Sequence, residues 1–444
     1  MGSGSGRAGS PELDGLVVRT VPISDPGDLI VQLPGPGSLA WIRRGEGLAG
    51  WGEVARVTVP AGQDRFTAAD KWLRALLEGA LIEDRVGAPG CGPVAFGSFT
   101  FDPTSEGSVL ILPQVILGRR GGQAWLTTIT GQPPAPPNLA RPAEYGLDRY
   151  GLDQAGRADP PVPRPAVPGL IRWHDGSLTA LQWERAVAAA VDRIKTGRLQ
   201  KVVLARDLYA SASGLIDERL LLDRLADRYP DCYTFACGGL VGATPELLIR
   251  RQGLQISSLV LAGTAPRGDD PAQDAALGTA LLASAKDTEE HGYAAAGVRE
   301  SLAPLCDELT VAPHPELLCL ANVQHLATTI SGRLAVAADG TSPSVLALAD
   351  ALHPTAAVCG TPAETAMELI RELEGMDRGR YAGPVGWVDS GGNGEWCIAL
   401  RCAELDGTRA RLFAGGGIVA DSDPAAELAE TQAKLRPMQS ALEG

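Results

Sequence analysis

The pattern of apolar and polar positions divides the chain into a strand-rich first part and a mixed second part. Residues 15–130 carry short runs of β-branched and aromatic residues between Gly and Pro, which predict strands joined by turns. Within them, residues 65–80 have helical spacing instead. Prolines dominate residues 131–169, which predict a long surface connection or a disordered insertion.

After residue 170, helices and paired strands follow one another in blocks. Trp183, Val187, Val191 and Ile194 fall on one face of a predicted helix that ends at Gly197. Later, two apolar runs flank the turn "SGGNG" and predict a hairpin. Because strands and helices do not alternate strictly, this order predicts an α+β fold with antiparallel sheets.

Capping residues mark two helix starts in the second part. Thr361, followed by Pro362 and by Glu364 three residues later, predicts a capping box with proline at the first helical position. Asp423 and Pro424 predict the start of the last helix in the same way.

Composition and charge exclude several classes of protein. The chain has 444 residues, 45% of them hydrophobic, and a net charge of −14, which argues against non-specific nucleic-acid binding but not against an anionic substrate. No apolar run reaches the roughly 20 residues of a membrane span. Residues 1–14 are Gly- and Ser-rich and predict a disordered tail rather than a signal peptide. The eight scattered cysteines predict reduced thiols and a cytoplasmic protein.

The last predicted helix carries three charged residues on one face. Glu427, Glu430 and Lys434 fall within about 60° of arc. Spacing alone favours a solvated face with a Glu-to-Lys pair four residues apart. The alternative is that this face lines a site.

A second acidic helix start invites a metal hypothesis. Glu289 and Glu290 suit the positive end of a helix dipole, and that interpretation is sufficient for this segment alone. The alternative is that Glu290 and Glu430, from separate helices, share a divalent cation such as Mg²⁺, which prefers carboxylate oxygens.

Two further residues have both an ordinary and a catalytic interpretation. Lys201 begins a very apolar strand, so it either reaches solvent from the strand end or, in an enclosed cavity, acts as a general base. Glu246 follows a proline before a strand and is either a turn carboxylate or a general acid kept protonated by an apolar site.

Glycine-rich turns and one arginine suggest anion binding. "LAGTAPRG" and "FAGGGIV" could offer backbone N–H groups to an anion, although such glycines more often form tight turns, and neither matches a nucleotide-binding motif. Arg401 interrupts the apolar run "IALRCAEL", which predicts a charge inside a strand that requires a carboxylate or a bound anion.

The order of these motifs is specific. Seven segments together resemble the chorismate-utilising enzymes, and within that family the isochorismate synthase group. They are, in chain order, "KVVLAR", "ATPELLIRR", "LAGTAPRG", "LLASAKDTEEH", "LHPTAAVCGTP", "GNGEWCIALRCAEL" and "RLFAGGGIVADSDPAAELAETQAKL". The resemblance covers residues 170–440 strongly and 15–130 loosely. It implies one large α+β domain over residues 15–440, with two stacked antiparallel β-sheets and helices outside.

The resemblance also implies roles for individual residues. Lys201 would activate the water that attacks ring carbon C2 of chorismate, and Glu246 would protonate the departing C4 hydroxyl. Mg²⁺ would be held by Glu290, Glu427 and Glu430. The residues implied in substrate binding are Gly263, Thr264, His353, Arg401, Gly416, Gly417 and Lys434.

Deviations from the family's other signatures narrow the expected activity. "EEHGYAAAGVRES" departs from the signature "EHxMLVDLxRND" of the ammonia-using members, so no glutaminase subunit is expected. Ala357 and Val358 are apolar where a salicylate synthase tends to carry a hydroxyl. We therefore expect a monomeric isochorismate synthase in siderophore or menaquinone synthesis, with salicylate synthase as the alternative and a non-catalytic chorismate-binding protein as the rival from another class.

Overall fold

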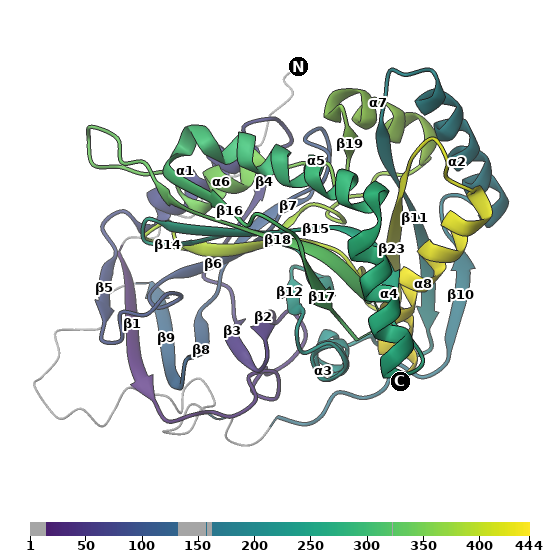
Figure 1. The fold of residues 1–444 in the computed structure, drawn as a ribbon. Coiled ribbons are helices and arrows are strands. Elements are labelled where there is room, and N and C mark those ends of the chain that lie inside the picture. Colours follow the sequence, from purple (N-terminus) through teal and green to yellow (C-terminus); the bar gives the residue numbers. More distant parts are fainter. Residues whose placement is uncertain (1–14, 132–156, 158–161, 322) are drawn as a thin grey trace, which may run out of the picture.

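Two large β-sheets pack against each other, and helices cover their outer sides (Figure 1). The computed structural model describes residues 15–131, 157, 162–321 and 323–444, without the side chains of residues 286 and 290. The predicted tail at 1–14 and most of the Pro-rich connection at 131–169 lie outside these residues. The α+β prediction, with antiparallel sheets and outer helices, is confirmed.

The larger sheet has thirteen strands within the described residues. In spatial order they are β10 (Ile171–Asp175), β11 (Lys201–Ala212), β23 (Arg409–Ile418), β22 (Cys402–Asp406), β13 (Leu240–Thr244), β12 (Tyr233–Cys237), β2 (Leu39–Arg43), β3 (Glu46–Trp51), β8 (Val115–Arg120), β9 (Gln123–Gly131), β1 (Leu16–Ile23) and β5 (Leu81–Asp84), with the short β19 (Gly360–Thr361) beside β11.

The smaller sheet has ten strands in the same described part of the chain. They run in the order β16 (Cys306–Val311), β18 (Val323–Leu334), β15 (Gln255–Pro266), β14 (Leu247–Gln252), β21 (Gly394–Ile398), β20 (Pro384–Asp389), β6 (Val94–Ser98), β7 (Ser108–Leu112) and β4 (Ala55–Val59), with β17 (Glu316–Cys319) beside β18. The predicted hairpin is β20 and β21, which pair in antiparallel register.

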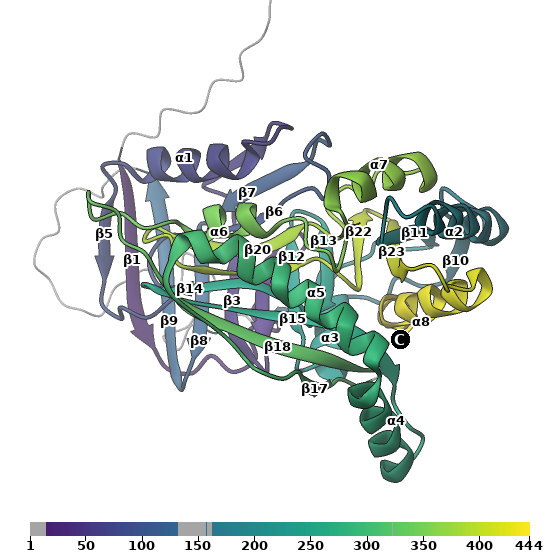
Figure 2. The ribbon, with the colours of Figure 1, turned by 45° about the horizontal axis from the view of Figure 1, so that its top comes forward.

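The helices gather in two groups. They are α1 (Arg65–Leu77), α2 (Ala180–Lys195), α3 (Glu218–Arg228), α4 (Pro271–Ala283), α5 (Ala285–Leu302), the 3₁₀ turn η2 (Ala303–Leu305), α6 (Val345–Leu352), α7 (Ala363–Leu373) and α8 (Pro424–Glu443). Helices α1, α5 and α6 lie along the smaller sheet, whereas α2, α7 and α8 surround β11 and β23 (Figure 1). Helix α4 projects from the body (Figure 2). None of the described helices combines the length and the apolar character needed to cross a bilayer.

One hydrophobic cluster joins the two sheets. It includes Trp41 and Phe235 from the larger sheet and Phe96, Ile249 and Trp396 from the smaller, each at most 2% exposed. Burial of such large apolar side chains is the dominant stabilising contribution to folding. The shared core therefore fixes the position of one sheet relative to the other.

The predicted face of α2 and the predicted start of α8 are confirmed. In α2, the predicted face is buried, and Thr179 and Gln182 form a capping box at its start. In α8, the Asp423 carboxylate accepts a hydrogen bond from the Ala426 N–H at 2.8 Å, and Pro424 occupies the first turn. Both starts satisfy N–H groups that have no partner inside the helix.

Two predicted helix starts are wrong. Thr361 belongs to β19, opposite Lys201, so it is committed to a strand pair, and α7 begins after Pro362 with no side-chain cap. The acidic helix does not begin at Glu289. It begins at Ala285, because the Ser284 hydroxyl accepts from the Asp287 N–H at 3.2 Å. The two glutamates consequently fall beyond its first turn.

Candidate active site

A cavity of about 250 Å³ lies where β11 and β23 of the larger sheet approach β15 and β18 of the smaller one. Helices α5 and α8 complete its wall. The lining residues are Lys201, Val203, Pro245, Glu246, Leu261, Ala262, Gly263, Thr264, Asp287, His325, Ala357, Val358, Arg378, Tyr381, Ala382, Leu400, Arg401, Gly415, Gly417, Val419, Ser422, Glu427, Glu430 and Lys434. Nine of the residues predicted from the sequence to act on substrate or metal line this cavity: Lys201, Glu246, Gly263, Thr264, Arg401, Gly417, Glu427, Glu430 and Lys434.

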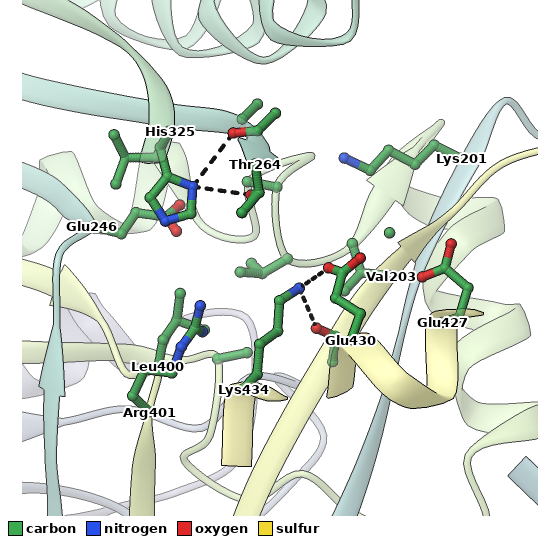
Figure 3. A pocket seen from close by; sticks show the side chains of 18 of the residues that line it. Lys201, Val203, Glu246, Thr264, His325, Leu400, Arg401, Glu427, Glu430 and Lys434 are labelled. Carbon is green, nitrogen blue, oxygen red and sulfur yellow. Dashed lines mark hydrogen bonds and ion pairs between the residues drawn. The ribbon is translucent and has the colours of Figure 1, made fainter. Parts of the chain in front are cut away.

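The charged face of α8 points into this cavity (Figure 3). The Lys434 ammonium forms an ion pair with Glu430 at 2.5 Å and donates to the Gly415 carbonyl at 2.9 Å. The Ser422 hydroxyl donates to the Glu427 carboxylate at 2.7 Å. The Glu-to-Lys pair that spacing predicts is thus present, but it lines a cavity rather than a fully solvated face.

The pKa values in this pair reflect burial and mutual attraction. Burial is the largest single influence on the pKa of Glu430 and would raise it, but the charge and hydrogen bond of Lys434, together with the charge of Arg401, hold that pKa below its usual value. Burial lowers the pKa of Lys434, and the nearby Arg401 charge adds to this effect. Arg401 and Lys434 are side by side in the cavity, so together they favour a bound anion (Figure 3).

Arg401 occupies a special backbone position. It does not lie inside a strand, as predicted, but in the connection between β21 and β22, with a left-handed φ of 46°. Within the described part of the chain, its guanidinium forms no ion pair with a carboxylate. Of the two partners predicted for this charge, a protein carboxylate or a bound anion, the bound anion remains.

Glu246 has the environment of a general acid. The carboxyl lies between β13 and β14 and is 8% exposed. Burial raises its pKa to about 7, and the charges of Arg401 and Lys201 limit that rise. At neutral pH a large fraction of this group therefore carries a proton that it can donate.

Lys201 and Glu246 point into the cavity from opposite sides (Figure 3). Lys201 is the first residue of β11 and is half-buried, so it does not simply reach solvent from the strand end. A basic and an acidic group are thereby available on the two sides of a ligand placed between them.

A bulge in β15 shapes the wall beside Glu246. Gly263 has a φ of +74°, and the register with β18 shifts between Ala262 and Thr264. The Thr264 hydroxyl lies 3.0 Å from Nδ1 of His325, which is also 3.4 Å from the Gly263 carbonyl. Burial lowers the pKa of His325 to about 4, so this imidazole is neutral at pH 7.

Two residues predicted for the site do not line this cavity, and a third, Glu290, is not described there. His353 does not line the cavity. It is buried with Nε2 3.0 Å from the Phe101 carbonyl, so its predicted contact with a ring lacks support. Gly416 lies behind the lining, where its missing side chain leaves room for Glu427. Glu290 belongs to α5, but its side chain lies outside the described residues.

The donor set can be tested against a Mg²⁺ ion. Among the described side chains, no group of three acidic, His or Cys residues stands ready to hold a metal. Glu427 and Glu430 are one helical turn apart and both line the cavity, and Asp287 from α5 lines it as well. Hard carboxylate oxygens of this kind fit Mg²⁺, which usually takes one or two protein carboxylates and keeps several waters.

Sequence reasoning missed several lining residues. Asp287 lies in the segment "LLASAKDTEEH", but the sequence pattern places the start of the helix after it, at Glu289. His325 and Tyr381 each begin or precede predicted strands, where nothing local distinguishes a lining residue from a core residue. Arg378 and its ion-pair partner Glu374 both lie after the end of α7, where no helical spacing indicates the pair.

Comparison with known proteins supports one assignment. A family described as "Chorismate binding enzyme" matches residues 40–443. The chain belongs to this family. The relatives include "Putative isochorismate synthase MenF" of Mycobacterium tuberculosis, 39% identical over 366 residues that cover 80% of this chain and 87% of that protein. "Salicylate biosynthesis isochorismate synthase" of Pseudomonas aeruginosa is 37% identical and covers 86% of this chain and 80% of its own length.

Solved structures of the chorismate-binding family share the fold. The menaquinone-specific isochorismate synthase MenF of Escherichia coli aligns with a TM-score of 0.78 and 26% identity over 96% of this chain and 95% of that one. Anthranilate synthase component I of Streptococcus pneumoniae aligns with a TM-score of 0.70 at 20% identity, over 88% and 91% of the two chains. The latter likeness concerns the fold alone.

Proposed function

We propose that this chorismate-binding enzyme is an isochorismate synthase. It adds water at C2 of chorismate and releases the C4 hydroxyl. The observation that carries the proposal is the pair Lys201 and Glu246 on opposite sides of one cavity that also holds Arg401 and Lys434. The named relatives support the same activity.

Glu246 acts as the general acid in this proposal. Loss of hydroxide from C4 is slow unless a proton reaches the leaving oxygen, and a carboxyl with a pKa of about 7 supplies one at neutral pH. The proton passes from the Glu246 carboxyl to the C4 oxygen, which leaves as water. The Glu246 carboxylate that remains lies near the charges of Lys201 and Arg401.

Lys201 acts as the general base on the other side of the ring. A lysine accepts a proton only as a neutral amine, and then removes it from the water that attacks C2. One water enters and one leaves, so the reaction is an isomerisation of the ring hydroxyl and needs no redox cofactor.

Two cationic side chains bind the carboxylates of the substrate. Chorismate is a dianion, and Arg401 offers a planar fork that suits a carboxylate. Lys434 lies beside it with one contact to Glu430 and one to the Gly415 carbonyl. Gly263, Thr264 and Gly417 complete the wall with small residues that leave space for a ring.

Glu427 and Glu430 would hold a Mg²⁺ ion, with Glu290 as the third predicted ligand. The ion, when bound, supplies positive charge for a substrate carboxylate. Both described carboxylates come from one turn of α8, next to Lys434.

One assay tests the proposal. The purified protein is incubated with chorismate and Mg²⁺, and products are separated by chromatography. Isochorismate alone is expected. Salicylate and pyruvate without a second enzyme would instead indicate a salicylate synthase, and bound but unconsumed chorismate a binding protein. A siderophore or menaquinone pathway, a cytoplasmic location and a monomeric state belong to the proposal as further expectations.

A further inference from the structure

One edge of β11 lacks a partner strand, among the described residues, between two short pairings. Lys201 and Val202 of β11 pair with β19, and Leu208 to Ala212 pair with β10 on the same edge. The segment between them, residues 203–207, is bounded by these two strands. Backbone groups at such a gap cost free energy when they are buried without partners.

Side chains take the place of the missing strand. The Val203 N–H still donates to the Cys359 carbonyl at 2.8 Å. Beyond that point, Nη2 of Arg378 donates to the Val203 carbonyl at 2.7 Å, and the Ala205 N–H donates to Oε1 of Glu374 at 2.7 Å. The indole of Trp183 donates to the Ala205 carbonyl at 3.2 Å.

The two residues that bridge the gap also form a buried ion pair. The side chains of Arg378 and Glu374 are 2% and 1% exposed. Nε of Arg378 donates to Glu374 at 2.9 Å, and Nη2 donates to it as well. Nη1 donates to the Val358 carbonyl at 2.8 Å. Of the five N–H groups of an arginine, four are therefore directed at protein acceptors.

The guanidinium thus ties two walls of the cavity together. Val203 and Val358 both line it, and each offers its carbonyl to the same Arg378. Lys201 stands two residues before Val203 on the same strand. The hydrogen bonds of Arg378 and Glu374 do not reach the elements that carry the two substrate-binding cations. Arg401 lies in the β21–β22 connection and Lys434 in α8.

We infer that Arg378 and Glu374 are positioning residues that complete the edge of β11 and thereby hold Lys201 at its working distance from the substrate. The pair acts through the strand. The inference rests on the proposed function for its kinetic consequences, whereas its consequences for the strand edge are independent of any substrate.

The first test measures amide hydrogen exchange without ligand. In Glu374→Leu, the carboxylate that accepts from Ala205 is lost, so a peptide covering residues 202–206 should exchange about tenfold faster or more. In Glu374→Gln, the amide oxygen can still accept from Ala205, so exchange of this peptide should increase less than in Glu374→Leu. Unchanged exchange in a folded Glu374→Leu protein would overturn the inference.

The second test measures steady-state kinetics of Arg378→Lys. Lysine keeps the charge but cannot serve two carbonyls and a carboxylate in one plane. We expect kcat to fall about tenfold to a hundredfold, because small displacements of a reacting group are costly, while KM changes much less. Wild-type kcat, or a change in KM alone, would contradict the positioning role.

A surface ion pair at α7 provides the matched control. Arg371 bonds Asp102 through Nε at 2.6 Å and Nη2 at 2.9 Å, a fork of the same kind that does not line the cavity. Arg371→Lys should leave both exchange at 202–206 and kcat unchanged.

If Arg378→Lys does not fold, the kinetics of Glu374→Gln decide. A smaller loss of kcat is expected for this variant, and wild-type kcat would overturn the inference. If the wild-type protein does not convert chorismate, the proposed function fails, and the exchange test still decides on the strand edge.

Discussion

Two Glu-to-cation pairs with the same sequence spacing border the cavity, and their environments differ. Glu374 and Arg378 are four residues apart, as are Glu430 and Lys434. The first pair is almost completely buried, and in it Arg378 donates to two backbone carbonyls while Glu374 accepts from the Ala205 N–H. In the second, the Glu430 side chain is 47% exposed and Lys434 has one backbone acceptor. Glu430 and Lys434 meet because they lie one turn apart on α8. Glu374 and Arg378 lie beyond the end of α7, and they meet through the path of the chain after that helix.

The largest effect is expected when the buried pair is broken. Glu374→Gln leaves the Arg378 charge in an apolar surrounding without a counter-charge, which costs about 3–5 kcal/mol of unfolding free energy. Denaturant unfolding of the variant and of Arg371→Lys would measure this. A loss similar to that of the surface control would mean that the two classes of pair are not distinct.

Glu246 adds a third case, a buried carboxyl whose pKa burial raises to about 7. In the unfolded chain it titrates near 4.5, and in the folded protein near 7. Between these values the folded state keeps a proton that the unfolded state has lost, so stability falls as the pH rises through this window. Glu246→Gln should remove this deficit and gain at most about 3 kcal/mol at pH 8 relative to pH 5, with loss of turnover. Equal differences in stability at both pH values would contradict the shifted pKa.

The open pair should affect ligand binding more than folding. Lys434→Met removes one of two cations proposed to bind the dianion, so KM should rise about tenfold to a hundredfold, the effect of losing a charged hydrogen bond of about 1.5–3 kcal/mol. Stability should change little. Lys195→Met, at the exposed end of α2, is the control. A stability loss as large as that of Glu374→Gln would remove the contrast between the pairs.

The smallest effect on folding is expected at Glu430. Its partly exposed ion pair contributes about 1 kcal/mol or less, so Glu430→Gln should unfold close to wild type. The same change removes a predicted Mg²⁺ ligand, so the Mg²⁺ concentration for half-maximal activity should rise, and calorimetry should show weaker Mg²⁺ binding. An unchanged metal dependence would exclude Glu430 as a ligand.

The sequence was informative where local periodicity or motif order decides the structure. The buried face of α2 and the cap of α8 follow from spacing and side-chain chemistry alone. The direction of the Glu427, Glu430 and Lys434 face did not follow from spacing, since a solvated helix has the same pattern. Only the motif order along the chain favoured a site there, through the family resemblance.

Other features depend on contacts between distant segments and were not accessible. Thr361 has the local pattern of a helix cap, and nothing local reveals that it pairs with Lys201, 160 positions away. Arg401 was placed inside a strand because composition does not show a left-handed residue. His325 became part of the site through a bulge at Gly263 in a neighbouring strand. Side-chain completion of the β11 edge likewise requires the tertiary arrangement.

Gly416 illustrates how a residue outside the lining of the active-site cavity can be restricted by chemistry alone. A Cβ atom there would come within 2.9 Å of the Glu427 carboxylate, the mobile end of a flexible side chain. The carboxylate could swing aside, so alanine at this position should still yield folded protein. A mutational scan that scores only the amount of folded protein would accept the substitution, whereas one that scores turnover would reject it.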